Sequence, residues 1–196
     1  MADSIIGITG KDFVLIAGDS AQTRSIMVIK ESGEDKILKL DSHKLLAASG
    51  ENGDRVAFTQ YIQKNLALQY YRNDAQSLST AAAAHFTRRA LADALRSNPY
   101  SSNLLLGGWD EEAGASLYYI DYLASMQKLP FGCQGYAGHF LMGLLDNGWK
   151  EDLSLEEARA LLDKCIAQLK QRFVLNQGEF IVKVVDKDGV RVLNDA

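Results

Sequence analysis

The sequence has little cysteine, no long apolar run and no concentration of basic residues. Its 196 residues include only two cysteines, Cys133 and Cys165, without CxxC or Cys/His ligand spacing. This counts against a disulfide framework and a zinc site, and it predicts free structural thiols in a reducing compartment. No apolar run approaches the roughly 18 residues that a membrane span needs. The N-terminus also lacks a basic region followed by an apolar stretch, so we expect a soluble intracellular protein.

The charge and composition are those of one acidic globular domain. The formal net charge is -4 with a pI near 5.4, and the densest basic cluster is only Arg88-Arg89. Nucleic acid is therefore not an expected partner. A chain of this length with 47% hydrophobic residues can bury roughly 70% of its unfolded surface. We expect a single domain over residues 1–196.

Most of the predicted strands are apolar runs that flank short turns. Residues 4–9 and 12–18 are rich in Ile and Val on either side of Gly10-Lys11, which predicts a hairpin. Asp188-Gly189 supplies a similar turn near the C-terminus. The expected strands are residues 4–9, 12–18, 35–40, 43–49, 103–109, 116–121, 124–131, 180–185 and 190–193.

Four helices are expected from apolar residues at helical spacing and from capping residues. Ser154 and Glu157 have the spacing of a capping box ahead of a regular apolar stripe. Ser79 supplies a capping hydroxyl before an alanine-rich segment. The expected helices are residues 53–71 (apolar at Val56, Tyr61, Ile62, Leu66 and Tyr70), from Thr80 to the stop at Asn98-Pro99, 136–147 (apolar at Tyr136, Phe140 and Leu144), and from Leu155 through Leu169.

The element order is strands, two helices, strands, two helices, strands. Helices that come in pairs between runs of hairpin-linked strands argue against alternating βαβ units. They favour antiparallel sheets that are covered by helices. We therefore predict an α+β fold in which two sheets lie between two helix pairs, a four-layer αββα sandwich.

Several strings of residues resemble the beta subunits of the eukaryotic 20S proteasome. The first strand, DSIIGI at residues 3–8, and the strings KILKL at 36–40 and GENGD at 50–54 match the family pattern. The resemblance covers roughly residues 3–193 and implies the N-terminal nucleophile hydrolase type of four-layer sandwich. Three further strings resemble its non-catalytic beta type-2 class, which takes the fourth position of the beta ring: GDRVAFTQYIQKN at 53–65, SLYYIDY at 116–122 and VVDKDG at 184–189.

The resemblance implies that the nucleophile is missing. Active members of the family begin with a threonine whose own α-amine serves as the base. Here that position holds Asp3, which has no hydroxyl and follows Met1-Ala2 without the glycine at which active precursors are cut. Of the supporting residues, Asp19, Thr23 and Lys36 match the family's aspartate, threonine and lysine.

The remaining positions of the family's site hold different residues. The family's serine before the third helix falls at Tyr136, and its aspartate and serine near the last strands fall at Phe173 and Asn176. We therefore expect no catalytic residue, no cofactor and no metal site. Lys36 is expected to pair with Asp19 for structural reasons.

Other candidate sites have an ordinary structural interpretation beside the functional one. Ser4 would become a nucleophile only after a cut behind Asp3, and Cys133 would need His139 as base and Asp146 as its orienting group. These residues define the alternative hypothesis, a self-contained hydrolase. The glycines at three-residue spacing before the third helix lack the Lys and Ser/Thr of a P-loop, so close packing is expected there. The glycines are Gly132, Gly135 and Gly138. No role is assigned to the two single histidines His43 and His85.

By resemblance, the expected function is that of a non-catalytic structural beta subunit. Its expected partners are the other alpha and beta subunits, in four stacked seven-membered rings that enclose a proteolytic chamber. Unfolded polypeptide, delivered by ubiquitin-dependent and ubiquitin-independent routes, would be cleaved there by neighbouring subunits. The expected location is the cytoplasm and nucleus, without membrane or nucleic-acid contact. A ring subunit should expose aromatic residues to its neighbours, and the candidates are Tyr70, Tyr71, Tyr100 and Trp149.

Overall fold

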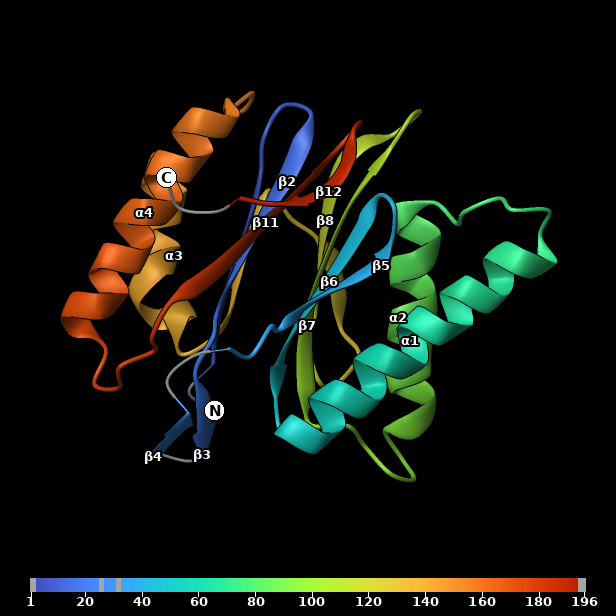
Figure 1. The fold of residues 1–196 in the computed structure, drawn as a ribbon, viewed down its shortest axis with the longest axis horizontal. Coiled ribbons are helices and arrows are strands. Elements are labelled where there is room, and N and C mark those ends of the chain that lie inside the picture. Colours follow the sequence, from blue (N-terminus) through green and yellow to red (C-terminus); the bar gives the residue numbers. More distant parts are fainter. Residues whose placement is uncertain (1–2, 25–26, 31–32, 194–196) are drawn as a thin grey trace.

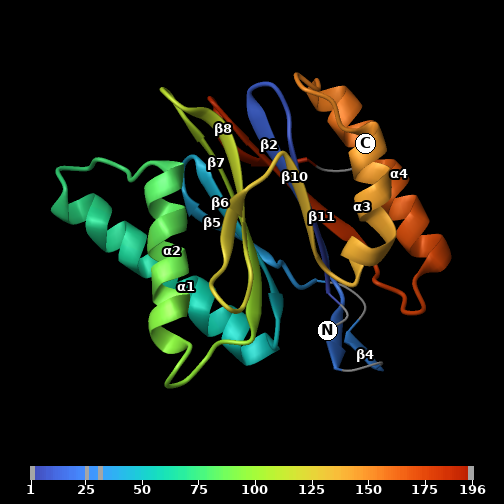
Figure 2. The ribbon, with the colours of Figure 1, turned by 180° about the vertical axis from the view of Figure 1, so that it is seen from behind.

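The computed structural model describes residues 3–24, 27–30 and 33–193. Two five-stranded antiparallel sheets pack face to face, and a pair of helices covers the outer face of each sheet (Figures 1 and 2). The predicted four-layer α+β sandwich is therefore confirmed. The expectation that the chain is not cut before Asp3 rests on Met1-Ala2, and these two residues lie outside the described residues.

The first sheet brings the N-terminal hairpin between two strands from the second half of the chain. β1 pairs with β10 so that Ser4 lies opposite Gly135, and β2 pairs with β11 so that Asp19 lies opposite Phe180. The strands in spatial order are β10 (Phe131–Gly135), β1 (Ser4–Thr9), β2 (Phe13–Asp19), β11 (Phe180–Asp186) and β12 (Gly189–Val192).

The second sheet is a meander of strands that follow one another in the sequence. A separate two-stranded ribbon, which the sequence did not predict, leads into it. The ribbon consists of β3 (Gln22–Arg24) and β4 (Met27–Lys30). The strands of the sheet are β5 (Ile37–Asp41), β6 (Lys44–Gly50), β7 (Ser102–Asp110), β8 (Gly114–Ile120) and β9 (Met126–Lys128).

The two helices for which the sequence predicts capping residues begin where those residues lie. Ser154 Oγ accepts the Glu157 N–H at 3.2 Å and Glu157 Oε2 accepts the Ser154 N–H at 3.0 Å, which completes the capping box. Ser79 Oγ caps the second helix by accepting the Ala82 N–H. Among the described residues, no helix is both long and apolar enough to cross a membrane. The helices are α1 (Asn52–Arg72), α2 (Thr80–Ala94), α3 (Ala137–Gly148) and α4 (Leu155–Arg172).

Three apolar layers hold the sandwich together, because both sheets are covered on both faces. Along β2 the side chains alternate: Leu15 packs toward α3 and α4, whereas Val14 and Ile16 pack between the sheets. Phe58 and Ile62 of α1 pack with the outer face of the second sheet. The central layer joins the two sheets through Ile5, Val14, Ile16, Ile37, Leu45, Ala47, Leu105, Leu117 and Val185.

The predicted strand at residues 124–131 is wrong. The segment forms two short strands in different sheets, since β9 pairs with β8 of the second sheet and β10 pairs with β1 of the first. Pro130 lies between them, and Ala124 has a φ of 63°, which is not a strand conformation. The chain therefore crosses from one sheet to the other where one straight strand was expected.

Two predicted helix faces are also partly wrong. In α3 the buried residues are Ala137, Leu141 and Leu145, one position beyond the expected set. In α1 Ile62 and Leu66 are buried as expected, but Val56, Tyr61 and Tyr70 are exposed. Both helices carry apolar residues on more than one side, so spacing alone does not select the buried face.

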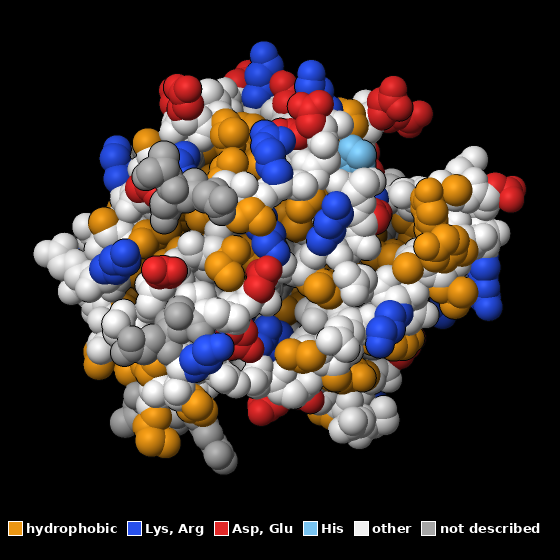
Figure 3. Space-filling view, viewed as in Figure 1, with side chains coloured by type: hydrophobic (Ala, Val, Ile, Leu, Met, Phe, Trp, Pro, Cys, Tyr) orange, Lys and Arg blue, Asp and Glu red, His pale blue; other side chains and the backbone are white. Residues whose placement is uncertain are grey.

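The exposed aromatic residues differ in part from those expected. Tyr71 is 80% exposed and Tyr70 is 39% exposed, near the C-terminal end of α1, where Figure 3 shows hydrophobic side chains gathered on the surface. Tyr100 instead packs against Phe58, with ring centroids 5.0 Å apart. Trp149 is partly buried and donates its Nε1–H to the Thr9 carbonyl at 2.9 Å. Two of these four residues are therefore exposed, and their contact with neighbouring subunits stays a prediction.

Candidate functional site

A buried group of charged side chains lies at one edge of the two sheets. Asp3 directly precedes β1, Asp19 ends β2, Lys36 directly precedes β5 and Gly50 ends β6. In antiparallel hairpins the first strand begins beside the point where the second ends. Two hairpins, one from each sheet, thus bring these four residues to the same place, although up to 47 positions separate them in the sequence.

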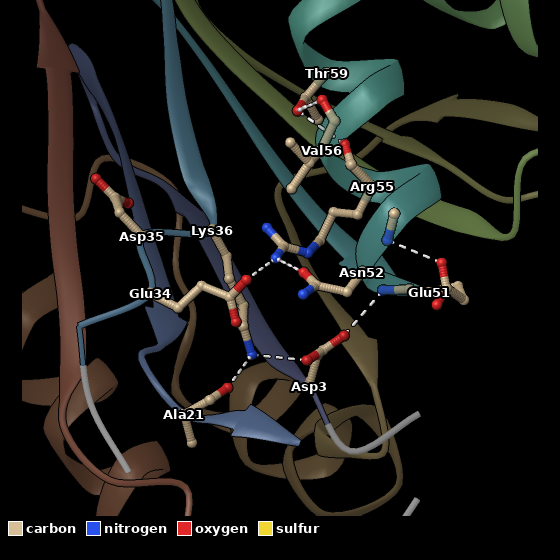
Figure 4. A network of polar contacts seen from close by, with 12 residues as sticks. Asp3, Ala21, Glu34, Asp35, Lys36, Glu51, Asn52, Arg55, Val56 and Thr59 are labelled. Atoms are coloured by element: carbon tan, nitrogen blue, oxygen red, sulfur yellow. Dashed lines mark hydrogen bonds and ion pairs between the residues drawn. The ribbon is translucent and has the colours of Figure 1, made fainter. Parts of the chain in front are cut away.

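Lys36 is the centre of this group. Its Nζ donates to Asp3 Oδ1 at 2.6 Å, to Asp19 Oδ2 at 2.7 Å and to the Ala21 carbonyl at 2.9 Å (Figure 4 shows the contacts with Asp3 and Ala21). The Lys36 and Asp19 side chains are each 1% exposed and that of Asp3 is 10% exposed. An ammonium group has three N–H donors, so all of its hydrogen-bonding capacity is used inside the protein.

The second oxygen of each carboxylate accepts a backbone N–H. Asp3 Oδ2 accepts from Gly50 at 2.9 Å, and Asp19 Oδ1 accepts from Ser4 at 2.7 Å. Gly50 has a φ of 144°, which favours glycine, and a Cβ on Gly135 would lie 1.9 Å from the Asp3 carbonyl oxygen. Glycine at these two positions lets the chain approach closely enough to enclose the charged group.

Burial is the dominant electrostatic effect on Asp19. It raises the pKa of the Asp19 carboxyl from 3.8 to about 6, although the Lys36 ammonium and the Ser4 N–H both favour the ionised form. Asp3 adds a smaller effect in the same direction as burial. The pKa of Asp19 is therefore the balance between burial, which favours the protonated carboxyl, and the neighbouring Lys36, which favours the carboxylate.

A second polar network flanks the first and fixes the segment that carries Lys36. Arg55 of α1 donates to both Glu34 and Asn52 (Figure 4), and the Arg55 side chain is 6% exposed. On the other side of Lys36, Asp35 pairs with Lys183 of β11. Three consecutive charged residues, 34 to 36, are therefore held by different parts of the fold.

The group has no nucleophile for acyl transfer. Asp3 has no hydroxyl, and its carboxylate already occupies the Gly50 N–H, a donor of the kind that stabilises an oxyanion. Lys36 bonds both carboxylates and is not placed to act as a base. Among the described residues, no cluster of three or more His, Cys, Asp and Glu side chains is suited to hold a metal ion.

The structure confirms the predicted pair of Lys36 and Asp19 and adds a partner that the sequence interpretation missed. That partner is Asp3. The resemblance aligned Asp3 with the nucleophile position and Lys36 with the family's lysine, and this was the available signal. Thr23 lies on β3 opposite Val28 and is half-buried. Within the described part of the chain it makes no hydrogen bond to Lys36.

Two of the three residues that the resemblance aligned with the family's other site positions form an aromatic contact. Tyr136 and Phe173 have ring centroids 6.2 Å apart, and Phe140 contacts the same ring at 6.1 Å. Asn176 Oδ1 accepts the Gly178 N–H at 3.1 Å within its own loop. Apolar packing and a local turn therefore occupy the positions that the resemblance aligned with hydroxyl and carboxyl groups of the family's active members.

Neither alternative nucleophile is poised to react. Ser4 is fully buried in β1, and its Oγ accepts a hydrogen bond from Gln177 Nε2. Cys133 is 7% exposed, and burial raises the pKa of its thiol well above the usual range. A nucleophilic cysteine needs a lowered pKa, so this environment favours the inert thiol. His139 lies beside Tyr136, with ring centroids 6.2 Å apart.

Comparison of the sequence with known proteins identifies the family to which the chain belongs. The family model described as "Proteasome subunit" matches residues 1–185. The chain belongs to the proteasome subunit family. It is 51% identical over 189 residues to proteasome subunit beta type-2-B of Arabidopsis thaliana, with 96% of this chain and 94% of the relative covered.

More distant relatives extend the same match. The proteasome subunit beta type-2 of Dictyostelium discoideum is 49% identical over 194 residues, with 97% of this chain and 96% of the relative covered. Proteasome subunit beta type-4 of Saccharomyces cerevisiae is 42% identical over 195 residues, with 98% of both chains covered. The similarity thus spans the two five-stranded sheets and the four helices of the described part of the chain.

Proposed function

We propose that this chain is a non-catalytic structural subunit in the beta ring of the 20S proteasome core. The observation that carries the proposal is Asp3, which stands at the nucleophile position and binds Lys36 and the Gly50 N–H. A proteasome subunit with a carboxylate there keeps the sandwich but lacks the hydroxyl that attacks the peptide bond. Its work is to complete the ring, while neighbouring subunits cleave the substrate.

The surface supports a role in assembly. Beyond Tyr70 and Tyr71, α1 exposes Leu68 by 43%, and α3 exposes Phe140 and Met142 by 40% and 42%. Exposed apolar groups on two helices that lie on opposite outer faces suit contacts with other subunits. In this proposal the partners are alpha and beta subunits in four stacked seven-membered rings. The substrate is unfolded polypeptide, and the subunit is located in the cytoplasm and nucleus.

Native mass spectrometry on the endogenous complex tests the proposal. The chain, carrying a C-terminal tag, is purified from its own cells, and the complex is weighed before and after release of the subunit. We expect a multi-ring particle and a released subunit that retains Asp3. A small free species, or a new N-terminus at Ser4, would overturn the proposal and favour the self-contained hydrolase.

Covalent labelling of the same particle separates the two functions. An electrophile that modifies N-terminal threonine is added, and the labelled subunits are identified by peptide mapping. We expect the label on neighbouring subunits and none on this chain. A label on Ser4 or Cys133, together with peptide cleavage by the isolated chain, would contradict a purely structural role.

A further inference from the structure

Two donor groups converge on the Asp3 carboxylate from different elements. The Lys36 ammonium approaches one oxygen at 2.6 Å, and the Gly50 N–H approaches the other at 2.9 Å. Figure 4 shows the Asp3 carboxylate facing the Lys36 ammonium. A carboxylate that receives one charge-assisted hydrogen bond and one backbone N–H on its two oxygens is bound as a ligand would be.

We propose that Lys36 and Gly50 form a carboxylate-binding site and that Asp3 is its resident ligand, supplied by the chain itself. The site takes small monocarboxylates of the formate and acetate type when the Asp3 side chain is removed. In the natural chain Asp3 excludes them, because a tethered group has a far higher effective concentration than a free ion. The inference goes beyond the proposed function and does not require that the chain assembles.

The donors of this site are held in place by contacts that do not involve Asp3. Lys36 is fixed by Asp19 and by the Ala21 carbonyl, and its own backbone carbonyl accepts the Ala48 N–H at 3.1 Å. Gly50 pairs with Ser102 across β6 and β7. Removal of the Asp3 side chain therefore leaves a preorganised cation and N–H, with space for one carboxylate.

The occupied site also explains how the start of β1 is fixed. The Asp3 side chain ties the segment before β1 to the end of β6 in the other sheet, and the Asp3 backbone lies against Gly135 of β10. A carboxylate at position 3 therefore links the two sheets at this edge through the charge of Lys36. Loss of that carboxylate should destabilise the chain in a way that a free carboxylate repairs.

Chemical rescue tests the proposal on the full-length chain. Thermal unfolding of Asp3→Ala is followed at pH 7.5 during titration with sodium formate, against sodium chloride at equal ionic strength. We expect saturable stabilisation by formate only. At a formate concentration of 100 times its dissociation constant, the unfolding equilibrium constant should fall about a hundredfold. The wild-type chain should show no difference between the two salts.

Three control variants make the result specific. Asp3→Asn fills the same space without charge, so formate should not stabilise it. Asp3→Ala combined with Lys36→Met lacks the cation and should not respond either. Asp12→Ala removes an exposed aspartate from the turn after β1 and should behave as wild type. Equal effects of formate and chloride on Asp3→Ala, or an equal formate response without Lys36, would overturn the proposal.

A refolding measurement covers the case in which Asp3→Ala does not fold in dilute salt. The variant is then refolded from denaturant in formate or in chloride, and the yield of soluble folded protein is compared. A higher yield in formate supports the site, and equal yields refute it. Since neither readout depends on ring assembly or peptide cleavage, failure here would leave the proposed function standing.

Discussion

Replacement of Lys36 by methionine should cost more stability than any other single charge deletion at this edge of the sheets. The substitution leaves Asp3 and Asp19 facing each other without a cation, with side chains 10% and 1% exposed. Removal of one partner from a buried ion pair typically costs about 3–5 kcal/mol. Methionine has similar length and is apolar, so little of the loss should come from a cavity.

The loss should depend on pH with a definite sign. Lys36 lowers the pKa of Asp19, and without Lys36 the folded-state pKa should rise above its present value of about 6. A carboxyl whose pKa is raised in the folded state stabilises the protein when protonated, and it loses this contribution as pH rises through the folded-state pKa. The destabilisation by Lys36→Met should therefore be large at pH 8 and smaller near pH 5.

Urea unfolding of wild type and Lys36→Met at pH 8 and pH 5 measures the loss of unfolding free energy and its dependence on pH. Lys150→Met is a matched control, because Lys150 also pairs with a carboxylate but its side chain is 62% exposed. The control should change stability little and equally at both pH values. A loss for Lys36→Met below about 1 kcal/mol, or one that is the same at pH 5 and pH 8, would refute the electrostatic reasoning.

Three further changes test the surroundings of the site and the fold. Gly135→Ala places a Cβ 1.9 Å from the Asp3 carbonyl oxygen at a φ of 76°. Thermal unfolding should show a greater loss of stability than for Gly114→Ala, where φ is 65° and no atom lies within 4 Å of the new Cβ. Equal losses of stability would exclude the close contact as the cause. Because the pKa of Asp19 is raised to about 6, the stability of wild type relative to Asp19→Asn should decrease by roughly 2 kcal/mol as pH rises from 4 to about 7. A flat or rising difference in urea titrations would contradict this sign. Ser154→Ala removes the capping box of α4 and should cost about 1 kcal/mol by thermal unfolding, whereas no change would mean that the cap is replaced by water.

Local signals explain why so much of the fold follows from the sequence. The Gly10-Lys11 and Asp188-Gly189 turns and the Ser154 capping box act over a few residues, so the sequence contains all that they need. The short ribbon of β3 and β4 was missed, because its strands have three and four residues and do not contribute to the apolar layers. The spacing of apolar residues alone does not predict a strand where the segment is short or apolar throughout.

The spacing of apolar residues also does not determine which face of a helix is buried. Tyr136, Phe140 and Leu144 and the buried set Ala137, Leu141 and Leu145 have identical four-residue spacing. They differ by one position, or about 100° around the helix. Which set is buried depends on the direction from which the first sheet approaches α3, and the local sequence does not contain that direction.

The sequence by itself determined the element order, the caps and turns, and the absence of a threonine at position 3, since each is a property of neighbouring residues. Only the tertiary structure decided what Asp3 does instead. Its partners Lys36 and Gly50 lie 33 and 47 positions away, and they meet it because two hairpins from different sheets end at the same edge. Burial there strengthens the charge interactions and raises the pKa of Asp19. A residue that reads in the sequence as a missing nucleophile is, in the folded chain, the bound counter-ion of a buried lysine.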